Sequence, residues 1–234
     1  MISVLDNKGD TPKDLPKSID VTVLLNGTPI GAPIPTTMHG DGIPVPYYPV
    51  RATFAQAGQY TLAATLAGAP STTQFTVVAP AKLPLIQPGA KLPAAQTPTT
   101  TDARGVKPIC TRQKNGAPDP CPLHDITLAD ALKTGKPTAF LISTPAYCQI
   151  GICGPVLDLL LEAKPDHPNV QFLHAEVYKD PASGSHDTAP IVDTFGLNYE
   201  PALYLASADG TIVERLDNVF DRTEIKLGLD KIKG

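Results

Sequence analysis

The sequence predicts two domains of different class, an all-β sandwich at the N-terminus and an α/β domain at the C-terminus. Three observations predict this division: short alternating segments fill residues 1–79, prolines recur through residues 80–107, and strand and helix patterns alternate over residues 108–234. A chain of 234 residues is long enough for two small domains. Charged residues make up only 18% of the chain and 26 residues are proline. This composition favours β-rich structure with an extended linker over a helical bundle.

The N-terminal region carries a series of short strand patterns. Residues 20–25 alternate and are followed by Asn26-Gly27, a dipeptide typical of hairpin turns. Further strands are expected over residues 50–54, 58–66 and 73–78. Short alternating strands at this spacing predict a β-sandwich. Residues 54–60, with Phe54 followed by Ala57-Gly58-Gln59-Tyr60, resemble a strand-turn-strand segment of immunoglobulin-like accessory domains. The resemblance implies an immunoglobulin-like fold for residues 1–79.

The proline-rich stretch over residues 80–107 predicts a linker between the two domains. Its prolines recur every four or five residues among Ala, Thr and Lys. Each proline restricts φ and removes a hydrogen-bond donor, so we expect the stretch to be extended and semi-rigid. The alternative is that it packs along one of the domains.

From residue 108 onward the hydrophobic pattern changes to alternating strands and helices. Thr127 or Asp125 is a plausible cap for a short helix ending at Thr134, and residues 137–143 form an apolar run typical of a strand in a covered sheet. The remaining expected elements are a helix over 149–164, a strand over 170–177, a short helix over 189–195, a hairpin of 202–206 with 211–216, and a final helix over 223–232. The order predicts an α/β fold.

Several motifs in this region occur in an order that resembles the thioredoxin superfamily. The strand Phe140-Leu-Ile-Ser143 runs into Cys148 and a long helix, and Pro155-Val-Leu-Asp158 is similar to the second half of that family's active-site helix. Glu200-Pro201 precedes a strand where the family has its cis-proline, and Asp209-Gly210-Thr-Ile-Val is similar to the family's following hairpin. The resemblance implies a thioredoxin-like fold for residues 108–234 and thiol–disulfide exchange as the activity.

The spacing of Cys148 and Cys153 departs from the Cys-x-x-Cys of that family, because four residues separate the two cysteines. In an ideal α-helix, residues five apart lie about 7.5 Å apart along the axis. A disulfide requires Cα atoms within about 7 Å of each other. We therefore expect either that Cys148 lies in the loop before the helix or that the first turn unwinds on oxidation. Gly151 and Gly154 lower the cost of both arrangements.

We expect Cys148 to be the attacking thiol and Cys153 the resolving thiol. Cys148 follows the strand directly, and the helix N-terminus beyond it would lower the pKa of its thiol. The reverse assignment stays open, since Cys153-Gly154-Pro155 matches the family's Cys-Gly-Pro, as does a purely structural disulfide. The resemblance also implies that Pro201 lies beside the two sulfurs. Asp158 and Glu200 are the nearest candidates for proton handling.

A second cysteine pair, Cys110 and Cys121, encloses a polar segment with turn residues. We expect a structural disulfide to close this loop and to stabilise the fold by roughly 2–3 kcal/mol. A second redox pair that relays electrons to Cys148 and Cys153 is the alternative. Cysteines in short-range pairs suit an oxidising compartment.

Three other functions use the same residues. A copper-handling protein resembling the Sco family would bind its ion through Cys148, Cys153 and His174, with His186 as the alternative to His174. A peroxiredoxin is the second alternative, because Thr144-Pro145 precedes Cys148, with Arg215 as the arginine that such a cysteine needs. A non-enzymatic binding module is the third. The remaining histidines, His39, His124 and His186, are expected to be surface or hydrogen-bonded residues.

Charge and hydropathy restrict the partners. The formal net charge is −4 and no cluster of Lys or Arg occurs, which excludes a nucleic-acid interface of the basic type. No cofactor motif is found, so the expected partner is a protein thiol or disulfide.

Residues 1–4 show no signal peptide. We expect that a leader or membrane anchor was removed and that the protein is extracellular or belongs to the cell envelope.

Overall fold

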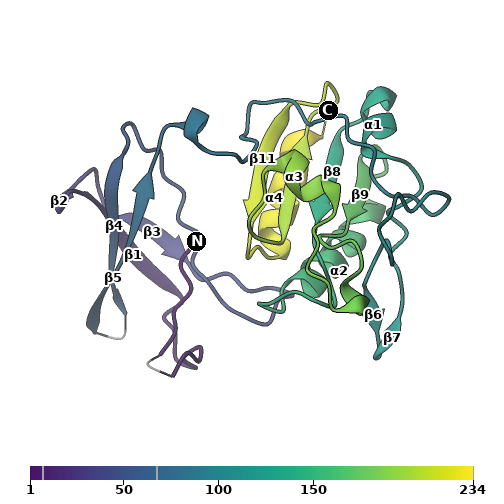
Figure 1. Cartoon of the computed structure of the whole chain (residues 1–234). Helices are drawn as coiled ribbons and strands as arrows, with labels where there is room; N and C mark the ends of the chain where they lie inside the picture. Colours follow the sequence, from purple (N-terminus) through teal and green to yellow (C-terminus); the bar gives the residue numbers. More distant parts are fainter. Residues whose placement is uncertain (7, 67, 234) are drawn as a thin grey trace. The chain divides into compact units, whose positions relative to one another are not determined.

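The computed structural model describes residues 1–6, 8–66 and 68–233 of the chain (Figure 1). The chain divides into two compact units. The first holds residues 1–40 and 45–83, and the second holds residues 41–44 and the chain from Pro84 onward. The first unit is all-β and the second is mixed α/β, so the coarse division predicted from the sequence is confirmed.

The N-terminal unit is an antiparallel β-structure centred on its first strand. Its strands are β1 (Ser18–Leu25), β2 (Thr28–Pro29), β3 (Ile34–Thr37), β4 (Gly58–Leu66) and β5 (Ala69–Val77). The order is β2-β1-β4-β5, and β3 pairs with the first half of β1. Asn26 and Gly27 both adopt positive φ, 49° and 82°, in the turn between β1 and β2. This left-handed turn is the one that the Asn-Gly dipeptide predicts.

One predicted strand of this unit is wrong. Residues 50–54 form no ladder, and the nearest pairing is an isolated bridge between Tyr48 and Ile2. Val50 instead packs against the buried cluster that contains Tyr48. Phe54 packs edge-on against Tyr60 and Phe75, with ring centroids 4.9 and 5.4 Å apart. The alternation of residues 50–54 therefore reflects separate side chains anchored from a loop and not a row of strand residues.

The predicted linker is also corrected, because residues 84–107 belong to the C-terminal unit. The backbone N–H of Gly89 donates to the carbonyl of Ile212, and that of Leu92 donates to the carbonyl of Gly210. Leu92 is 5% exposed and Val106 is 1% exposed, both within the core of this unit. The prolines keep the stretch extended, while the apolar side chains between them bind it to the domain.

The C-terminal unit is built on a four-stranded mixed sheet of order β11-β10-β8-β9. The strands are β8 (Thr138–Ile142), β9 (Gln171–Ala175), β10 (Ala202–Ala206) and β11 (Ile212–Asp217). β8 and β9 are parallel, whereas β10 runs antiparallel to β8 and to β11. Every residue of β8 and of β10 is buried, as expected for the two central strands.

Helices and short turns connect these strands. The α-helices are α1 (Leu128–Ala131), α2 (Cys153–Ala163), α3 (Pro190–Phe195) and α4 (Arg222–Ile232). Short 3-10 turns lie at η1 (Pro80–Lys82), η2 (Leu132–Thr134), η3 (Lys164–Asp166) and η4 (Pro181–Ser183), and a small hairpin is formed by β6 (Gln113–Lys114) and β7 (Ala117–Pro118). Thr127 caps α1 by accepting a hydrogen bond from the backbone N–H of Asp130, as predicted.

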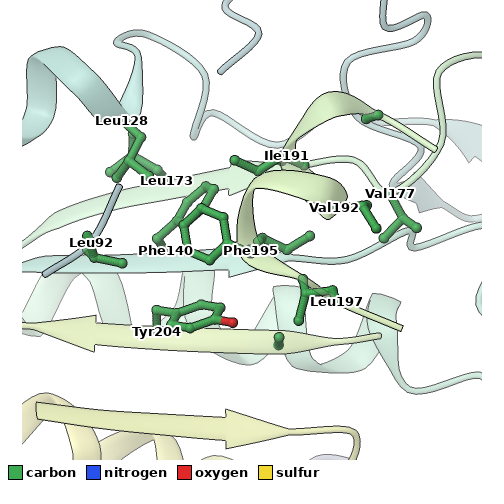
Figure 2. Packing of buried hydrophobic residues seen from close by; sticks show 14 of the residues in the cluster. Leu92, Leu128, Phe140, Leu173, Val177, Ile191, Val192, Phe195, Leu197 and Tyr204 are labelled. Atoms are coloured by element: carbon green, nitrogen blue, oxygen red, sulfur yellow. The ribbon is translucent and has the colours of Figure 1, made fainter. Parts of the chain in front are cut away.

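The sheet is covered on both faces. On one face, Phe140 and Tyr204 pack with Phe195 of α3 and with Leu128 of α1 (Figure 2). On the other face α2 and α4 contact each other, and α4 lies on β10 and β11. Gly228 of α4 is required there, because an added Cβ would lie 2.2 Å from the Cδ1 atom of Leu205. Within the described residues, no helix combines the length and the apolar character needed to cross a bilayer.

Candidate functional site

Cys148 lies in the loop between β8 and α2, the first of the two arrangements that its spacing allows. The predicted helix start at residue 149 is wrong, because α2 begins at Cys153. Gly151 has a φ of +67°, a left-handed conformation that breaks the helical path between the two cysteines. The loop turns so that the backbone N–H of Gly151 donates to the carbonyl of Cys148 at 3.2 Å.

The start of α2 stabilises the thiolate form of Cys148. The N-cap residue Ile152 offers no side-chain acceptor, and the backbone N–H of Cys153 donates to the sulfur of Cys148 at 3.3 Å. The thiol of Cys153 and then the backbone N–H groups of this turn lower the pKa of Cys148 to about 6. Burial raises the pKa of Cys153, which is 0% exposed. At neutral pH the site therefore holds one partly exposed thiolate and one buried thiol.

Glu200 acts on the same site from the segment before β10, and the expected place of Pro201 beside the two sulfurs stays a prediction. The Glu200-Pro201 peptide bond is cis. Glu200 is half-buried, and burial followed by the negative charge of Cys148 raises the pKa of its carboxyl group. The other predicted proton carrier, Asp158, has a different role, since its carboxylate accepts a hydrogen bond from Nε of Arg112 at 2.7 Å. Of the two carboxylates, Glu200 is the one whose charge acts on Cys148.

The surface beside Cys148 is apolar. Tyr147 is 43% exposed and Ile150 is 49% exposed. These two side chains flank the sulfur in the sequence, one directly before it and one two residues after it. Both side chains are therefore open to contact with another molecule beside Cys148.

Arg215 does not have the role that a peroxidatic cysteine would require. Its Nε atom donates to both carboxylate oxygens of Asp217, and its Nη1 atom donates to the carbonyl of Ile86 at 2.7 Å. The guanidinium is thus occupied by the hairpin and by the proline-rich stretch. The peroxiredoxin alternative loses the one arginine on which it depended.

The second cysteine pair lies at the base of the β6–β7 hairpin. Asn115 and Gly116 form its turn with positive φ, and the backbone N–H of Asp119 donates to the carbonyl of Arg112. This closure brings the chain back on itself, so that the backbone N–H of Cys121 donates to the sulfur of Cys110 at 3.3 Å. Both cysteines are 4% exposed.

Two histidines converge on this pair from separate elements. His124 follows Cys121 by three residues, and its Nε2 atom lies 3.3 Å from the sulfur of Cys121. His174 comes from β9, with Nδ1 at 3.6 Å from the same sulfur and 3.3 Å from Nε2 of His124. The four donor atoms of Cys110, Cys121, His124 and His174 all lie within 4.8 Å of one another, and all four residues are buried. We call this group the Cys/His cluster.

The ring of His174 is fixed from its far side. Its Nε2 atom lies 3.0 Å from the hydroxyl oxygen and 3.1 Å from the carbonyl oxygen of Ser143. A carbonyl only accepts, so Nε2 carries a proton, and in the neutral ring Nδ1 presents a lone pair to the cluster. Burial acts to lower the pKa of His174, but the hydrogen bond and the charge of Cys110 raise it overall. Burial lowers the pKa of His124, which favours its neutral, ligating form. The Nδ1 atom of His124 has no hydrogen-bond partner among the described residues.

The structure gives three predicted site residues new neighbours. Cys110 and Cys121 are adjacent free thiols, as Cys148 and Cys153 are, so the expected Cys110–Cys121 disulfide stays a prediction. The structure adds two histidines to this pair in one buried cluster, which makes metal binding an alternative to the disulfide. His174 joins that cluster and not Cys148 and Cys153, so the copper set expected from the Sco resemblance is not assembled among the described residues. His124 was expected to be an ordinary loop residue. The sequence pattern that could have identified His124 as a metal ligand is the Cys121-x-x-His124 spacing, which is common among metal ligands.

A buried carboxylate connects the two cysteine sites. One oxygen of Glu176 accepts hydrogen bonds from both the backbone N–H and the hydroxyl of Thr111, each at 2.6 Å. The same hydroxyl accepts from the backbone N–H of Ala146, two residues before Cys148. The chain beside Cys110 is thereby linked to the loop that carries the exposed thiol.

Comparison of the chain with protein-family models and with curated proteins finds no match.

Proposed function

We propose that the protein is a thiol–disulfide oxidoreductase with Cys148 as the attacking thiol. The observation that carries this proposal is the asymmetry of the Cys148/Cys153 pair. One sulfur is accessible and its pKa is lowered to about 6, while its neighbour is buried with a raised pKa. This asymmetry is what an attacking and a resolving thiol require.

The reaction proceeds as two exchanges of the same kind. The Cys148 thiolate attacks one sulfur of a substrate disulfide, a mixed disulfide forms, and the other substrate sulfur leaves as a thiolate. Cys153 then loses its proton and attacks the Cys148 sulfur. The products are a Cys148–Cys153 disulfide and a substrate dithiol, so two electrons pass from the protein to the substrate. The half-buried carboxyl group of Glu200 is the candidate acceptor for the Cys153 proton.

The topology of the C-terminal unit supports a thioredoxin-like fold. A parallel β8–α2–β9 unit is followed by α3, the antiparallel β10–β11 hairpin and α4, in the sheet order β11-β10-β8-β9. This arrangement has the order of elements that the sequence resemblance implies. Cys148 lies at the end of the central parallel strand, where a helix N-terminus stabilises negative charge.

The N-terminal unit is proposed to be an immunoglobulin-like domain. The hydroxyl of Tyr60 donates to the carbonyl of Gln56, four residues upstream, at 2.9 Å. A tyrosine that bonds back to the preceding backbone in this way is typical of immunoglobulin-type sandwiches. Together the two folds suit a protein of the cell envelope or the extracellular space that acts on the thiols or disulfides of other proteins.

The test is a redox titration of the purified full-length chain in glutathione buffers, with mass mapping of each cysteine. We expect the Cys148–Cys153 disulfide to form and to be reduced reversibly at a potential between roughly −120 and −270 mV. The variant Cys153→Ser should accumulate a mixed disulfide at Cys148, and Cys148→Ser should not. The double variant Cys148→Ser/Cys153→Ser measures how much Cys110 and Cys121 contribute to the redox titration.

Two results would overturn the proposal. A Cys148–Cys153 disulfide that resists reduction throughout the titration would leave only the binding-module alternative. A pair that never oxidises, in protein whose circular dichroism shows it folded, would exclude exchange at this site.

A further inference from the structure

The Cys/His cluster is a second site, outside the proposed redox centre. None of its four members belongs to the Cys148/Cys153 pair, and they come from three parts of the chain. Cys110 begins the β6–β7 hairpin segment, Cys121 and His124 end it, and His174 lies on β9 at the edge of the sheet. The backbone N–H of His174 donates to the carbonyl of Leu123, which holds the hairpin segment against that edge.

The spacing of the donor atoms matches tetrahedral coordination. With metal–nitrogen bonds of about 2.0–2.1 Å and metal–sulfur bonds of about 2.3 Å, tetrahedral ligand atoms lie roughly 3.3–3.8 Å apart. The two ring nitrogens are 3.3 Å apart, and the sulfur of Cys121 lies 3.6 Å from His174 and 3.3 Å from His124. Three of the four donor atoms therefore lie at tetrahedral spacing, and the sulfur of Cys110 lies within 4.8 Å of each of them.

The chemistry of the donor set selects the ion. Two thiolates and two neutral imidazoles prefer a borderline or soft cation and exclude Mg²⁺ and Ca²⁺, which require oxygen ligands. Four protein ligands fill a tetrahedral coordination shell, which leaves no position on the ion for water or a substrate. A closed set of this composition is typical of structural zinc.

A disulfide would satisfy this cluster less well. It would engage the two sulfurs only and leave the facing nitrogens of His124 and His174 with the one hydrogen bond between them, at 3.3 Å. A cation instead takes a lone pair from every member at once. His174 is also oriented as metal-bound histidines are, with its second nitrogen held by Ser143.

An access route to the cluster exists. A surface pocket of about 670 Å³ is lined by Cys110, Cys121 and His124, and also by Ala146 and Tyr147 next to the redox loop. An ion can therefore reach the ligands without unfolding of the sheet.

We infer that Cys110, Cys121, His124 and His174 form a structural zinc site that fixes the β6–β7 segment to the edge strand β9. Binding releases the thiol protons of Cys110 and Cys121 to solvent and changes no oxidation state. Through Thr111, Glu176 and Ala146, the site also supports the loop that carries Cys148.

The test is metal titration of the full-length chain after reduction with a phosphine, which removes disulfides without adding a competing thiol. Zinc affinity is measured by competition with a chromophoric chelator, and cobalt replaces zinc for visible spectroscopy. We expect one ion per chain, with the absorption bands of tetrahedral cobalt bound to thiolate. The variants Cys121→Ser and His174→Ala should weaken binding by more than about a hundredfold, beyond the effect of losing an outer partner.

Matched controls come from the same chain. His186→Ala removes an exposed histidine outside the cluster, and Cys148→Ser/Cys153→Ser removes the other two thiols. Both should retain one ion with unchanged affinity. Loss of binding in the Cys148→Ser/Cys153→Ser variant would overturn the assignment, as would a reduced wild-type chain that binds neither zinc nor cobalt.

A second readout remains valid if the ligand variants fail to fold. In the wild-type chain, zinc should protect Cys110 and Cys121 from alkylation, and a strong chelator should remove that protection. Equal labelling of these two cysteines with and without zinc would contradict the inference.

Discussion

The two cysteine pairs of this protein are similar in sequence and opposite in environment. Cys148 and Cys153 are separated by four residues and Cys110 and Cys121 by ten. In the first pair one sulfur is accessible and faces the start of a helix. In the second pair both sulfurs are 4% exposed and face two histidines. The comparison teaches that two cysteine pairs of one chain can have opposite surroundings, and these surroundings are the basis for proposing exchange at the first pair and metal binding at the second.

The largest expected effect separates the pairs by function. Cys148→Ser should reduce the rate of exchange with a model disulfide by more than about 10³-fold, because the nucleophile is lost. Stopped-flow absorbance with an aromatic disulfide measures the rate. Zinc binding should remain at one ion per chain. If the variant kept most of the exchange activity, the reactive thiol would be another cysteine, and the functional difference between the two pairs would be disproved.

The next effect is a difference in accessibility. In native, zinc-loaded protein, we expect Cys148 to be alkylated more than about a hundred times faster than Cys110, because a buried thiol reacts only after local opening. Peptide mass spectrometry over a time course gives both rates. Comparable rates would mean that the hairpin segment opens freely.

The pH dependence of alkylation tests the cause of the asymmetry. The pKa of Cys148 is about 6, whereas an unperturbed cysteine titrates near about 8.5. At pH 7 its thiolate fraction should therefore exceed that of an ordinary cysteine by about thirtyfold, since the thiolate is populated above the pKa and lost below it. The rate of iodoacetamide labelling should fall as the pH drops through about 6. A midpoint near 8.5 would remove the electrostatic argument for Cys148.

A smaller effect on zinc affinity is expected from the hydrogen-bond partner of His174 outside the Cys/His cluster. Ser143→Ala removes one of the two oxygens at Nε2 of His174 and leaves the backbone carbonyl. Zinc affinity should fall by about tenfold, at the lower end of the range for outer partners of a metal ligand. Chelator competition measures it. No change would assign the orientation of the ring to the carbonyl alone.

The smallest effect concerns Glu200. Its negative charge disfavours the thiolate of Cys148, because like charges raise each other's pKa. Glu200→Gln should lower the pKa of Cys148 by less than about one unit, seen as a shift of the alkylation midpoint to lower pH. A shift to higher pH would show that the carboxyl group stabilises the thiolate by another route.

The sequence alone determined much of the C-terminal fold. The apolar run before Cys148, the Asp209-Gly210 turn and the cap at Thr127 each act through neighbours in the chain, and each lies where it was expected. Cys148 and Cys153 were identifiable for the same reason, since a strand followed by a helix defines their setting locally. The start of α2 was missed because one left-handed glycine, Gly151, decides it.

Only the tertiary structure brought Cys110 and Cys121 together with two histidines. Their partner His174 lies 53 residues beyond Cys121 in the chain and reaches it through the pairing of β9 with β8. The proline-rich stretch was misjudged for a similar reason, because Leu92 and Val106 are buried by residues distant in sequence. Local patterns specify turns, caps and helix starts, whereas burial and ligand sets depend on which distant segments the sheet brings together.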